Sequence, residues 1–272
     1  MIESDMAELA TMKPKEYRDI IRAGKFADEA AKRMLWPCQG YAQANLAIVP
    51  EGYAFEFLLF CNRNPRPCPV LDVTDHGDPH PKLMAPEADL RTDVGRYRVF
   101  EHGELVDEPT DIIKYWKNNL VCFLLGCSRT FTQALHAGNI SWRRYSAYRT
   151  NIPCIPAGRL HGHMVVTVRA FYNAHDAVRV VQILSRHPLM HGPPIHIGDP
   201  AEIGITDLSK PDPLFSSGTP TEPPKPSEVV MIWGCGVTPE TVAMESKIPL
   251  MITHNPGHMF MTDKQVEKLA IL

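Results

Sequence analysis

The chain of 272 residues has a formal net charge of -3 and 22% charged residues, which excludes the strong global field that draws nucleic acids or anionic membranes to a protein. Its seven cysteines are odd in number and no pair has CxxC spacing, which argues against a zinc ribbon and predicts reduced thiols. Because the opening segment lacks the apolar core of a signal peptide and no later stretch is long enough to cross a bilayer, we expect a cytoplasmic protein without a membrane partner.

Apolar periodicity and proline positions predict the first elements of the chain. Pro14 can occupy the first turn of a helix over 16–35, and this helix stops near Pro37. A strand over 41–49 then leads into a buried helix over 54–64, which a following proline closes. The N-terminal part therefore reads as helix, strand and helix.

A short strand and a hairpin come next. The apolar segment 69–73 predicts the strand. His102 and Gly103 supply a tight turn between two further strands, at 96–100 and 104–106. This hairpin is the clearest local signal in the first half of the chain.

From residue 111 onward, helical and extended patterns alternate, which is typical of α/β proteins. We expect a mixed sheet with flanking helices, arranged as two intimately packed α/β subdomains, with an inserted subdomain at about 130–208. Residues 209–228 carry six prolines and predict a linker or a long surface loop, with a lid as a further reading. The remaining expected elements are helices at 111–119, 129–138, 175–187 and 239–247, and strands at 121–125, 148–155, 164–171, 229–233 and 249–252.

The sequence GCS at 126–128 falls between an apolar strand and a helix. Ser128 is expected to be the N-cap of that helix. Backbone N–H groups and the positive helix end would stabilise a carboxylate or a developing oxyanion and depress the pKa of Cys127, and Arg129 would add a fixed cation. The alternative is that Cys127 is a small core residue and Ser128 only a helix cap.

A second turn, GCGVTP at 234–239, repeats this arrangement. Cys235 stands at the end of a strand and Thr238 in a capping position. Ligands of open α/β sheets bind at the carboxyl ends of strands, so both turns could face one crevice. If the two strands are antiparallel, the turns lie at opposite edges instead.

The run HGPPIHIGDP at 191–200 combines His191, His196 and Asp199 with three prolines and two glycines. Prolines and glycines favour a stiff, turned loop that can line a site. His254 follows a later strand in a similar Pro/Gly turn. These residues suit acid–base catalysis or metal binding, but their spacing matches no specific metal signature, so we expect no metal or other cofactor. The alternative is a loop that simply crosses the surface.

Cationic and acidic side chains near two turns could hold an amino acid. Arg63 and Arg91 offer guanidinium groups for carboxylates, and Asp93 offers a carboxylate for an ammonium group, although surface salt bridges are the alternative. No phosphate-binding glycine motif and no GxSxG elbow is present. The basic and aromatic segment 141–149 reads as a solvated face, so the expected partner is a small carboxylic or amino acid and no nucleic acid. The sequence leaves a homo-oligomer open.

Eight segments occur together along nearly the whole chain in the order typical of one family. They are QANL at 43–46, CNRNPRPCP at 61–69, RTD at 91–93, GCS at 126–128, NIPC at 151–154, HGPPIHIGDP at 191–200, GCGVTP at 234–239 and ITHNPGHM at 252–259. Through them the chain, as a single unit over 1–272, resembles the D-glutamate cyclase family, whose uncharacterised bacterial members are labelled hydro-lyases of the YcsI type. The resemblance implies a lyase of amino-acid metabolism that converts D-glutamate to 5-oxo-D-proline and water.

The resemblance also gives the candidate residues expected roles. The arginines would clamp carboxylates, Asp93 or Asp199 would orient the ammonium group, and the GCS turn would hold the oxyanion. His191 or His196 would transfer protons, or Cys127 would form a γ-thioester that the amine then captures. The catalytic set is Cys127, Ser128, His191, His196 and Asp199, and the substrate-binding set is Arg63, Arg91, Asp93, Arg129, Cys235, Thr238 and His254.

One departure from the family pattern bears on the substrate. Family members commonly read GCSFSFE where this chain reads GCSRTFT, so a candidate carboxylate is lost and Arg129 is gained. This favours a more anionic or differently shaped substrate. The alternatives are a hydro-lyase or amide hydrolase that acts on another small carboxylic acid, with or without a metal, and a non-catalytic carboxylate-binding protein.

Overall fold

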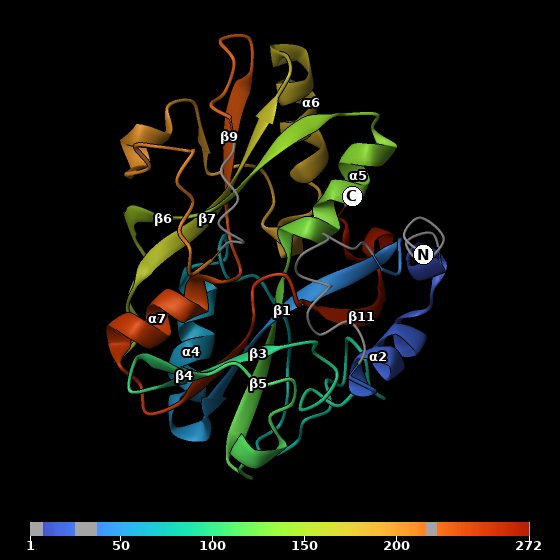
Figure 1. Cartoon of the computed structure of the whole chain (residues 1–272), viewed down its shortest axis with the longest axis vertical. Helices are drawn as coiled ribbons and strands as arrows, with labels where there is room; N and C mark the ends of the chain where they lie inside the picture. Colours follow the sequence, from blue (N-terminus) through green and yellow to red (C-terminus); the bar gives the residue numbers. More distant parts are fainter. Residues whose placement is uncertain (1–7, 25–36, 216–221, 272) are drawn as a thin grey trace.

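The computed structural model describes residues 8–24, 37–215 and 222–271, and these form two antiparallel sheets with helices packed around them (Figure 1). In Figure 1 the larger sheet fills the lower half of the molecule and the smaller sheet the upper half. The α/β fold of two packed subdomains is therefore confirmed. The described helices are α2 (Pro14–Arg22), α4 (Glu51–Arg63), α5 (Ser128–Ala137), α6 (Ala174–Leu184) and α7 (Thr238–Ser246).

The larger sheet has the order β2-β5-β1-β10-β3-β4, and β11 also pairs with β1. Every pairing in this sheet is antiparallel. Its central strand β1 is buried on both faces, which explains its nearly continuous apolar sequence. Its strands are β1 (Tyr41–Pro50), β2 (Val70–Val73), β3 (Tyr97–Glu101), β4 (Glu104–Asp107), β5 (Leu120–Gly126), β10 (Met251–His254) and β11 (Phe260–Gln265).

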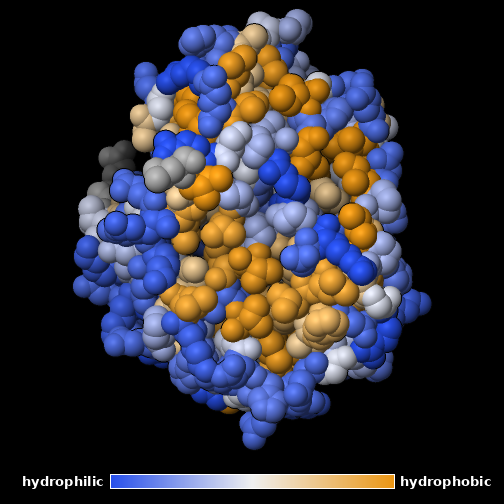
Figure 2. Space-filling model, turned by 180° about the vertical axis from the view of Figure 1, so that it is seen from behind, coloured by the Kyte–Doolittle hydropathy of each residue, from blue (hydrophilic) through white to orange (hydrophobic). Residues whose placement is uncertain are grey.

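Alternate residues of β1 enter two different apolar clusters. Leu46 and Ile48 pack with the long loop that precedes β3, whereas Ala47 and Val49 pack with α4 and α7. The outer side of α4 leaves Phe55 exposed, and Figure 2 shows hydrophobic residues gathered on the rear face of this lower half. One helical layer and one loop layer thus cover the larger sheet.

The smaller sheet has the order β6-β7-β9-β8 and is also antiparallel. One face packs against α5 and α6, and the other packs against the loop around Ile203, Ile205 and Leu208. The face that α5 and α6 cover also carries Arg169 of the sheet, which contacts Ser128 at the N-terminus of α5. The strands are β6 (Trp142–Pro153), β7 (His163–Phe171), β8 (His196–Ile197) and β9 (Val229–Gly234).

Most expected elements are present, and one is wrong. The hairpin has positive φ at both His102 and Gly103, as a type I′ turn requires. The helix expected at 111–119 is only a 3-10 turn, Ile113–Tyr115, because this short connection buries Ile112 in the core and leaves Ile113 exposed. Short 3-10 turns also lie at Pro188–Met190, Pro200–Ile203 and Val266–Leu269.

Two expected segments extend beyond the described residues. The helix at 16–35 is described as α2, which ends at Arg22, and residues 25–36 lie outside the described part. Of the Pro-rich stretch 209–228, residues 216–221 also lie outside it, and the described remainder holds turns and irregular backbone. None of the described helices combines the length and the apolar character that crossing a bilayer requires.

Candidate functional site

The two glycine turns of the sequence meet at the junction of the sheets, although they follow strands of different sheets. Asn45 on β1 donates a hydrogen bond from Nδ2 to the carbonyl oxygen of Gly126, at 2.5 Å. A Cβ on Gly236 would lie 2.0 Å from the same Nδ2 atom. One side chain therefore touches both turns. The sequence left open whether the turns share a crevice or lie at opposite edges of one sheet; β5 and β9 belong to two different sheets, and the turns meet where these sheets pack against each other.

The glycines allow this close approach. A Cβ on Gly126 would lie 1.8 Å from the carbonyl oxygen of Leu189, and a Cβ on Gly234 would lie 2.9 Å from Pro67. Neither backbone segment can retreat at low cost. The glycines thus bring the loop before β2 and the loop of His191 against the ends of β5 and β9.

Two arginines stand directly opposite each other in the smaller sheet. The register of β6 and β7 pairs Arg144 with Arg169. Arg169 is 1% exposed, and it donates to the hydroxyl and carbonyl oxygens of Ser128 at 3.3 and 3.4 Å. Its guanidinium carbon lies 4.6 Å from the ring centre of Phe131. Arg169 therefore fixes the first turn of α5 against the smaller sheet.

Arg129 adds a third guanidinium on α5. It is 8% exposed and lines a pocket of about 10 Å³ with Tyr17 and Gln43, close to the smallest volume that holds one water. Burial, together with the charge of Arg144, lowers the pKa of Arg129 to about 10 and that of Arg169 to about 9. All three guanidinium groups therefore lie near one another and stay protonated at neutral pH.

Two thiols complete the cluster. Cys127 is buried and is the N-cap of α5, since its Sγ accepts from the backbone N–H of Arg129 at 3.5 Å. Ser128, expected as the N-cap, is the first residue of the helix. Burial raises the pKa of Cys127 even though the nearby arginines lower it, so the expected depression of this pKa is wrong. Burial also raises the pKa of Cys235 to about 12.

Solvent reaches this cluster from one side. Arg144 is exposed, yet protein atoms surround it closely enough for desolvation to lower its pKa. Cys235 is half-buried. The cluster of Cys127, Arg129, Arg144, Arg169 and Cys235, called the arginine cluster below, can bind an anion next to the N-terminus of α5.

His191 lies behind the GCS turn. It is 1% exposed and has a positive φ of 73°. Its Nδ1–H donates to the carbonyl oxygen of Arg66 at 2.6 Å, and its Nε2 has no hydrogen-bond partner among the described residues. Burial lowers its pKa to about 4. The His191 imidazole is thus buried and neutral at pH 7, and it packs between two loops.

His196 and Asp199 lie on the outer edge of the smaller sheet. His196 Nε2 contacts the carbonyl oxygen of Asp199 at 2.9 Å, and β8 pairs with the middle of β9. The carboxylate of Asp199 accepts from the backbone N–H of Ala201 and caps a 3-10 turn. The described side-chain hydrogen bonds and ion pairs of these two residues are with their own loop, and none is with the arginine cluster.

Thr238 and His254 are both buried in the core. The Thr238 hydroxyl donates to the carbonyl oxygen of Cys235 at 2.8 Å and accepts from the N–H of Val165, so it braces the turn while Val237 is the N-cap. His254 Nδ1 accepts from the N–H of Leu46 at 3.3 Å, and burial lowers its pKa to about 3. The structure thus gives both side chains partners within the fold.

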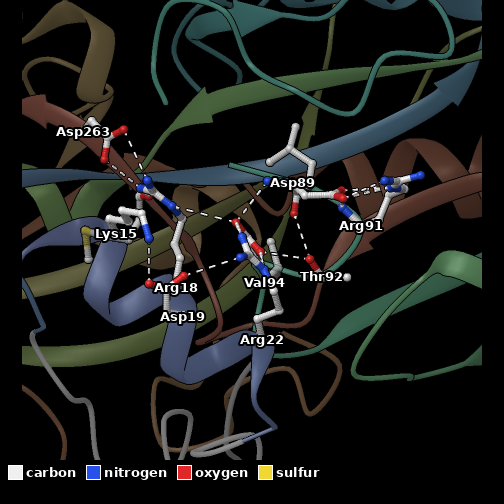
Figure 3. A network of polar contacts seen from close by, with 12 residues as sticks. Lys15, Arg18, Asp19, Arg22, Asp89, Arg91, Thr92, Val94 and Asp263 are labelled. Atoms are coloured by element: carbon white, nitrogen blue, oxygen red, sulfur yellow. Dashed lines mark hydrogen bonds and ion pairs between the residues drawn. The ribbon is translucent and has the colours of Figure 1, made fainter. Parts of the chain in front are cut away.

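Arg91 and Asp93 belong to the polar network that docks α2, in which Figure 3 labels Arg18, Arg22 and Arg91. Asp93 accepts a bidentate pair of hydrogen bonds from Arg22 at 2.7 and 2.9 Å, and Arg18 lies 3.8 Å from it. Arg91 pairs with Asp89 at 2.7 Å. These charges satisfy one another.

Arg63 lies at the end of α4 and donates from Nη1 to the carbonyl oxygen of Pro156 at 2.5 Å. This bond ties α4 to the connection between β6 and β7. No described contact joins Arg63 to the arginine cluster. The predicted substrate-binding arginines therefore lie in three separate environments, and only Arg129 belongs to the cluster.

Another buried acid lies in the first turn of α7. Glu240 is fully buried, with Arg98 Nη1 at 2.8 Å and the Thr253 hydroxyl at 3.4 Å. Burial raises its pKa to about 7, and Arg98 opposes the shift. Its partners belong to the larger sheet. Within the described ranges, no three histidine, cysteine or acidic side chains gather as metal ligands.

Sequence reasoning missed Asn45, Arg144 and Arg169. Arg144 stood in the segment read as a solvated face, and Arg169 in a strand whose other residues are mostly apolar. Arg144 lies before the strand expected at 148–155, so the expected elements gave no signal that it pairs with Arg169. Only the register of β6 and β7 shows that they face each other.

Comparison with known proteins agrees with this arrangement of segments. The sequence model of the D-glutamate cyclase family matches residues 121–263, which hold all five members of the arginine cluster. A solved nitrogen repressor-like protein from Methanococcus jannaschii aligns over 93% of this chain and 97% of its own, but at 10% identity and a TM-score of 0.38 it carries no argument.

Curated bacterial relatives match over almost their whole length. The protein named "Putative hydro-lyase YcsI" in Bacillus subtilis is 49% identical over 96% of this chain and 100% of its own. A relative of the same description in Geobacillus kaustophilus is 50% identical over 98% and 100%, and one in Bacillus licheniformis is 49% identical over 96% and 98%. By sequence over nearly its full length, this chain belongs to the D-glutamate cyclase family.

Proposed function

We propose that the protein is a hydro-lyase that converts D-glutamate to 5-oxo-D-proline and water at the arginine cluster. One observation supports this site above the others: Arg129, Arg144 and Arg169 gather at the N-terminus of α5, beside a thiol that solvent can reach. A small dicarboxylic acid needs such a set of cations. The family membership supplies the reaction class.

The cluster can hold both ends of the substrate. Guanidinium groups bind the two carboxylates and fold the chain, which brings the amine near the γ-carbon and makes the attack intramolecular. The C–N bond forms and a C–O bond breaks. Because the ammonium nitrogen loses two protons and the departing oxygen gains two, the oxygen leaves as water with no net proton uptake.

The N-terminus of α5 stabilises the oxyanion formed during the attack. The positive end of the helix lies at the cluster, and Arg169 holds Ser128 in place at 3.3 Å. Cys127 contributes the helix cap. Because its thiol is protonated at neutral pH, a direct attack by the amine is favoured over a γ-thioester.

Proton NMR tests the reaction. Purified protein is incubated separately with D-glutamate, L-glutamate and 5-oxo-D-proline, before and after EDTA. The Arg144→Gln variant should lose turnover, and Arg149→Gln, an exposed arginine on the same strand that pairs with Asp212, should keep it. Absence of turnover in the folded wild-type protein, with divalent metal supplied, would exclude D-glutamate cyclisation.

A further inference from the structure

The outer side of α4 is apolar and exposed. The sequence predicted a buried helix here, and the inner side does carry Phe57, Phe60 and Cys61 into the core. On the opposite side, however, Phe55 is 75% exposed and Leu58 is 41% exposed. A helix that is apolar on both sides is normally buried on both sides. The outer side of α4 therefore suits contact with another protein surface.

The exposed residues of α4 have the spacing of a helix that packs along another helix. Glu51, Phe55, Leu58 and Asn62 are all exposed, and steps of four, three and four residues place them in one line along the helix. The two apolar residues lie in the middle of this line, and the two polar residues lie at its ends. These four residues are called the α4 stripe below.

The two ends of α4 carry opposite charges. Glu51 lies in the first turn, where its carboxylate is 58% exposed and contacts His76 at 3.1 Å. Arg63 lies exposed in the last turn, next to Asn62. Its described hydrogen bond goes to a backbone carbonyl, that of Pro156, and it makes no ion pair within the described residues. A carboxylate from another molecule can therefore pair with Arg63.

We propose that the α4 stripe is the interface of a two-fold symmetric dimer, in which α4 packs antiparallel to α4 of a second copy of this chain. A two-fold axis at the middle of the stripe brings Phe55 of each copy against Leu58 of the other. The same axis brings the Glu51 end of each helix to the Arg63 end of the other. The stripe is thus complementary to itself, by apolar contact at the centre and by charge at the ends.

Residues beside the stripe suit the edge of such an interface. Glu56 and Arg159 pair with each other at 2.8 Å, and the Arg159 guanidinium carbon lies 3.8 Å from the ring centre of Tyr53, so this flank is polar and satisfied within one copy. Ile155 is 58% exposed, and its backbone bonds to Asn64 at the end of α4, which extends the apolar surface past the helix. Stable interfaces combine an apolar centre with a polar rim.

Sedimentation velocity of the full chain tests the dimer. The wild type should pass from monomer to dimer within roughly 1–200 μM, as expected of a small interface. Phe55→Gln should weaken dimerisation by at least about 30-fold, because it removes the central apolar contact. Since Phe55 is exposed, this variant should fold as the wild type does. Val178→Gln, which changes a 59% exposed apolar residue of α6, is the matched control and should leave dimerisation unchanged.

Charge reversal tests the antiparallel arrangement. Glu51→Arg alone and Arg63→Glu alone each place like charges together at both ends of the interface and should weaken dimerisation about tenfold. The double variant restores opposite charges between the two copies and should dimerise as the wild type does. Circular dichroism establishes that each variant is folded, and Phe55→Gln decides alone if a charge variant is not.

Four outcomes overturn the inference. They are a wild type that stays monomeric over this range, a dimer that Phe55→Gln leaves intact, equal weakening by Val178→Gln, and a folded double charge variant that dimerises no better than the single ones. Each of them leaves the proposed function standing, because no residue of the α4 stripe belongs to the arginine cluster.

Discussion

Replacement of His191 by asparagine should make the stability of the protein less sensitive to acid. His191 is 1% exposed, and burial lowers its pKa from 6.5 to about 4. Asparagine tolerates the positive φ of 73° at this position, and its amide can donate to the Arg66 carbonyl as Nδ1–H does. His191→Asn therefore removes the titrating group and keeps the backbone and the hydrogen bond.

The sign and the size follow from proton linkage. Below about pH 6.5, His191 is protonated in the unfolded chain but stays neutral in the folded protein. The free energy of unfolding therefore falls as the pH drops toward 4. At 1.36 kcal/mol per pH unit, the full shift is worth about 3 kcal/mol, of which about 2 kcal/mol is lost between roughly pH 7.5 and pH 5. His191→Asn should remove this loss from the pH dependence, whatever its stability at neutral pH.

Urea unfolding at about pH 7.5 and pH 5 measures the difference. The wild-type protein should lose roughly 2 kcal/mol more than His191→Asn over this interval. His161→Asn, which changes an exposed histidine, should behave as the wild type. If the wild type and His191→Asn lost the same free energy of unfolding between these two pH values, His191 would not be a buried, neutral imidazole in the folded protein. Turnover by the same folded variant tests the proton-transfer role that the sequence suggested.

Three further substitutions test the frame around the site. Gly236→Ala places a Cβ 2.0 Å from Asn45 Nδ2 and should separate the two turns. The free energy of unfolding in urea should fall by about 3 kcal/mol. The control is Gly52→Ala, whose Cβ meets no atom within 4 Å. Cys127→Ala removes the helix cap, costs about 1 kcal/mol, and should keep measurable turnover by NMR, since a thioester route would lose it. Asp93→Asn should destabilise the protein by about 2 kcal/mol in urea and expose α2 to limited proteolysis, because it removes the buried carboxylate that accepts two hydrogen bonds from Arg22 and leaves Asp263 as the carboxylate beside Arg18.

Apolar runs and glycine turns were sufficient to predict much of the fold. The strands β5 and β9 coincide with runs that are buried on both faces, and Gly103 marks the hairpin by its positive φ. The segment 111–119 has helical composition, yet it forms only a 3-10 turn at Ile113–Tyr115. Tertiary burial of Ile112 decides its path.

The site was only half visible in the sequence. The GCS turn and Arg129 are contiguous, so local pattern identifies them. Arg144 and Arg169 lie 25 positions apart, and their meeting depends on the register of an antiparallel pair whose register shifts twice after Arg144. The histidines looked reactive because imidazole titrates near neutral pH, but burial of His191 removes that property.

The cross-strand arginine pair is the feature that local stability explains least. Two like charges placed opposite each other repel, and the described hydrogen bonds of the buried one, Arg169, go to neutral oxygens. Close-packed glycines hold the surrounding turns in place, and Asn45 joins the turns of both sheets. An anion bound at the N-terminus of α5 would turn repulsion within the pair into attraction, which agrees with the carboxylate substrate of the proposed function.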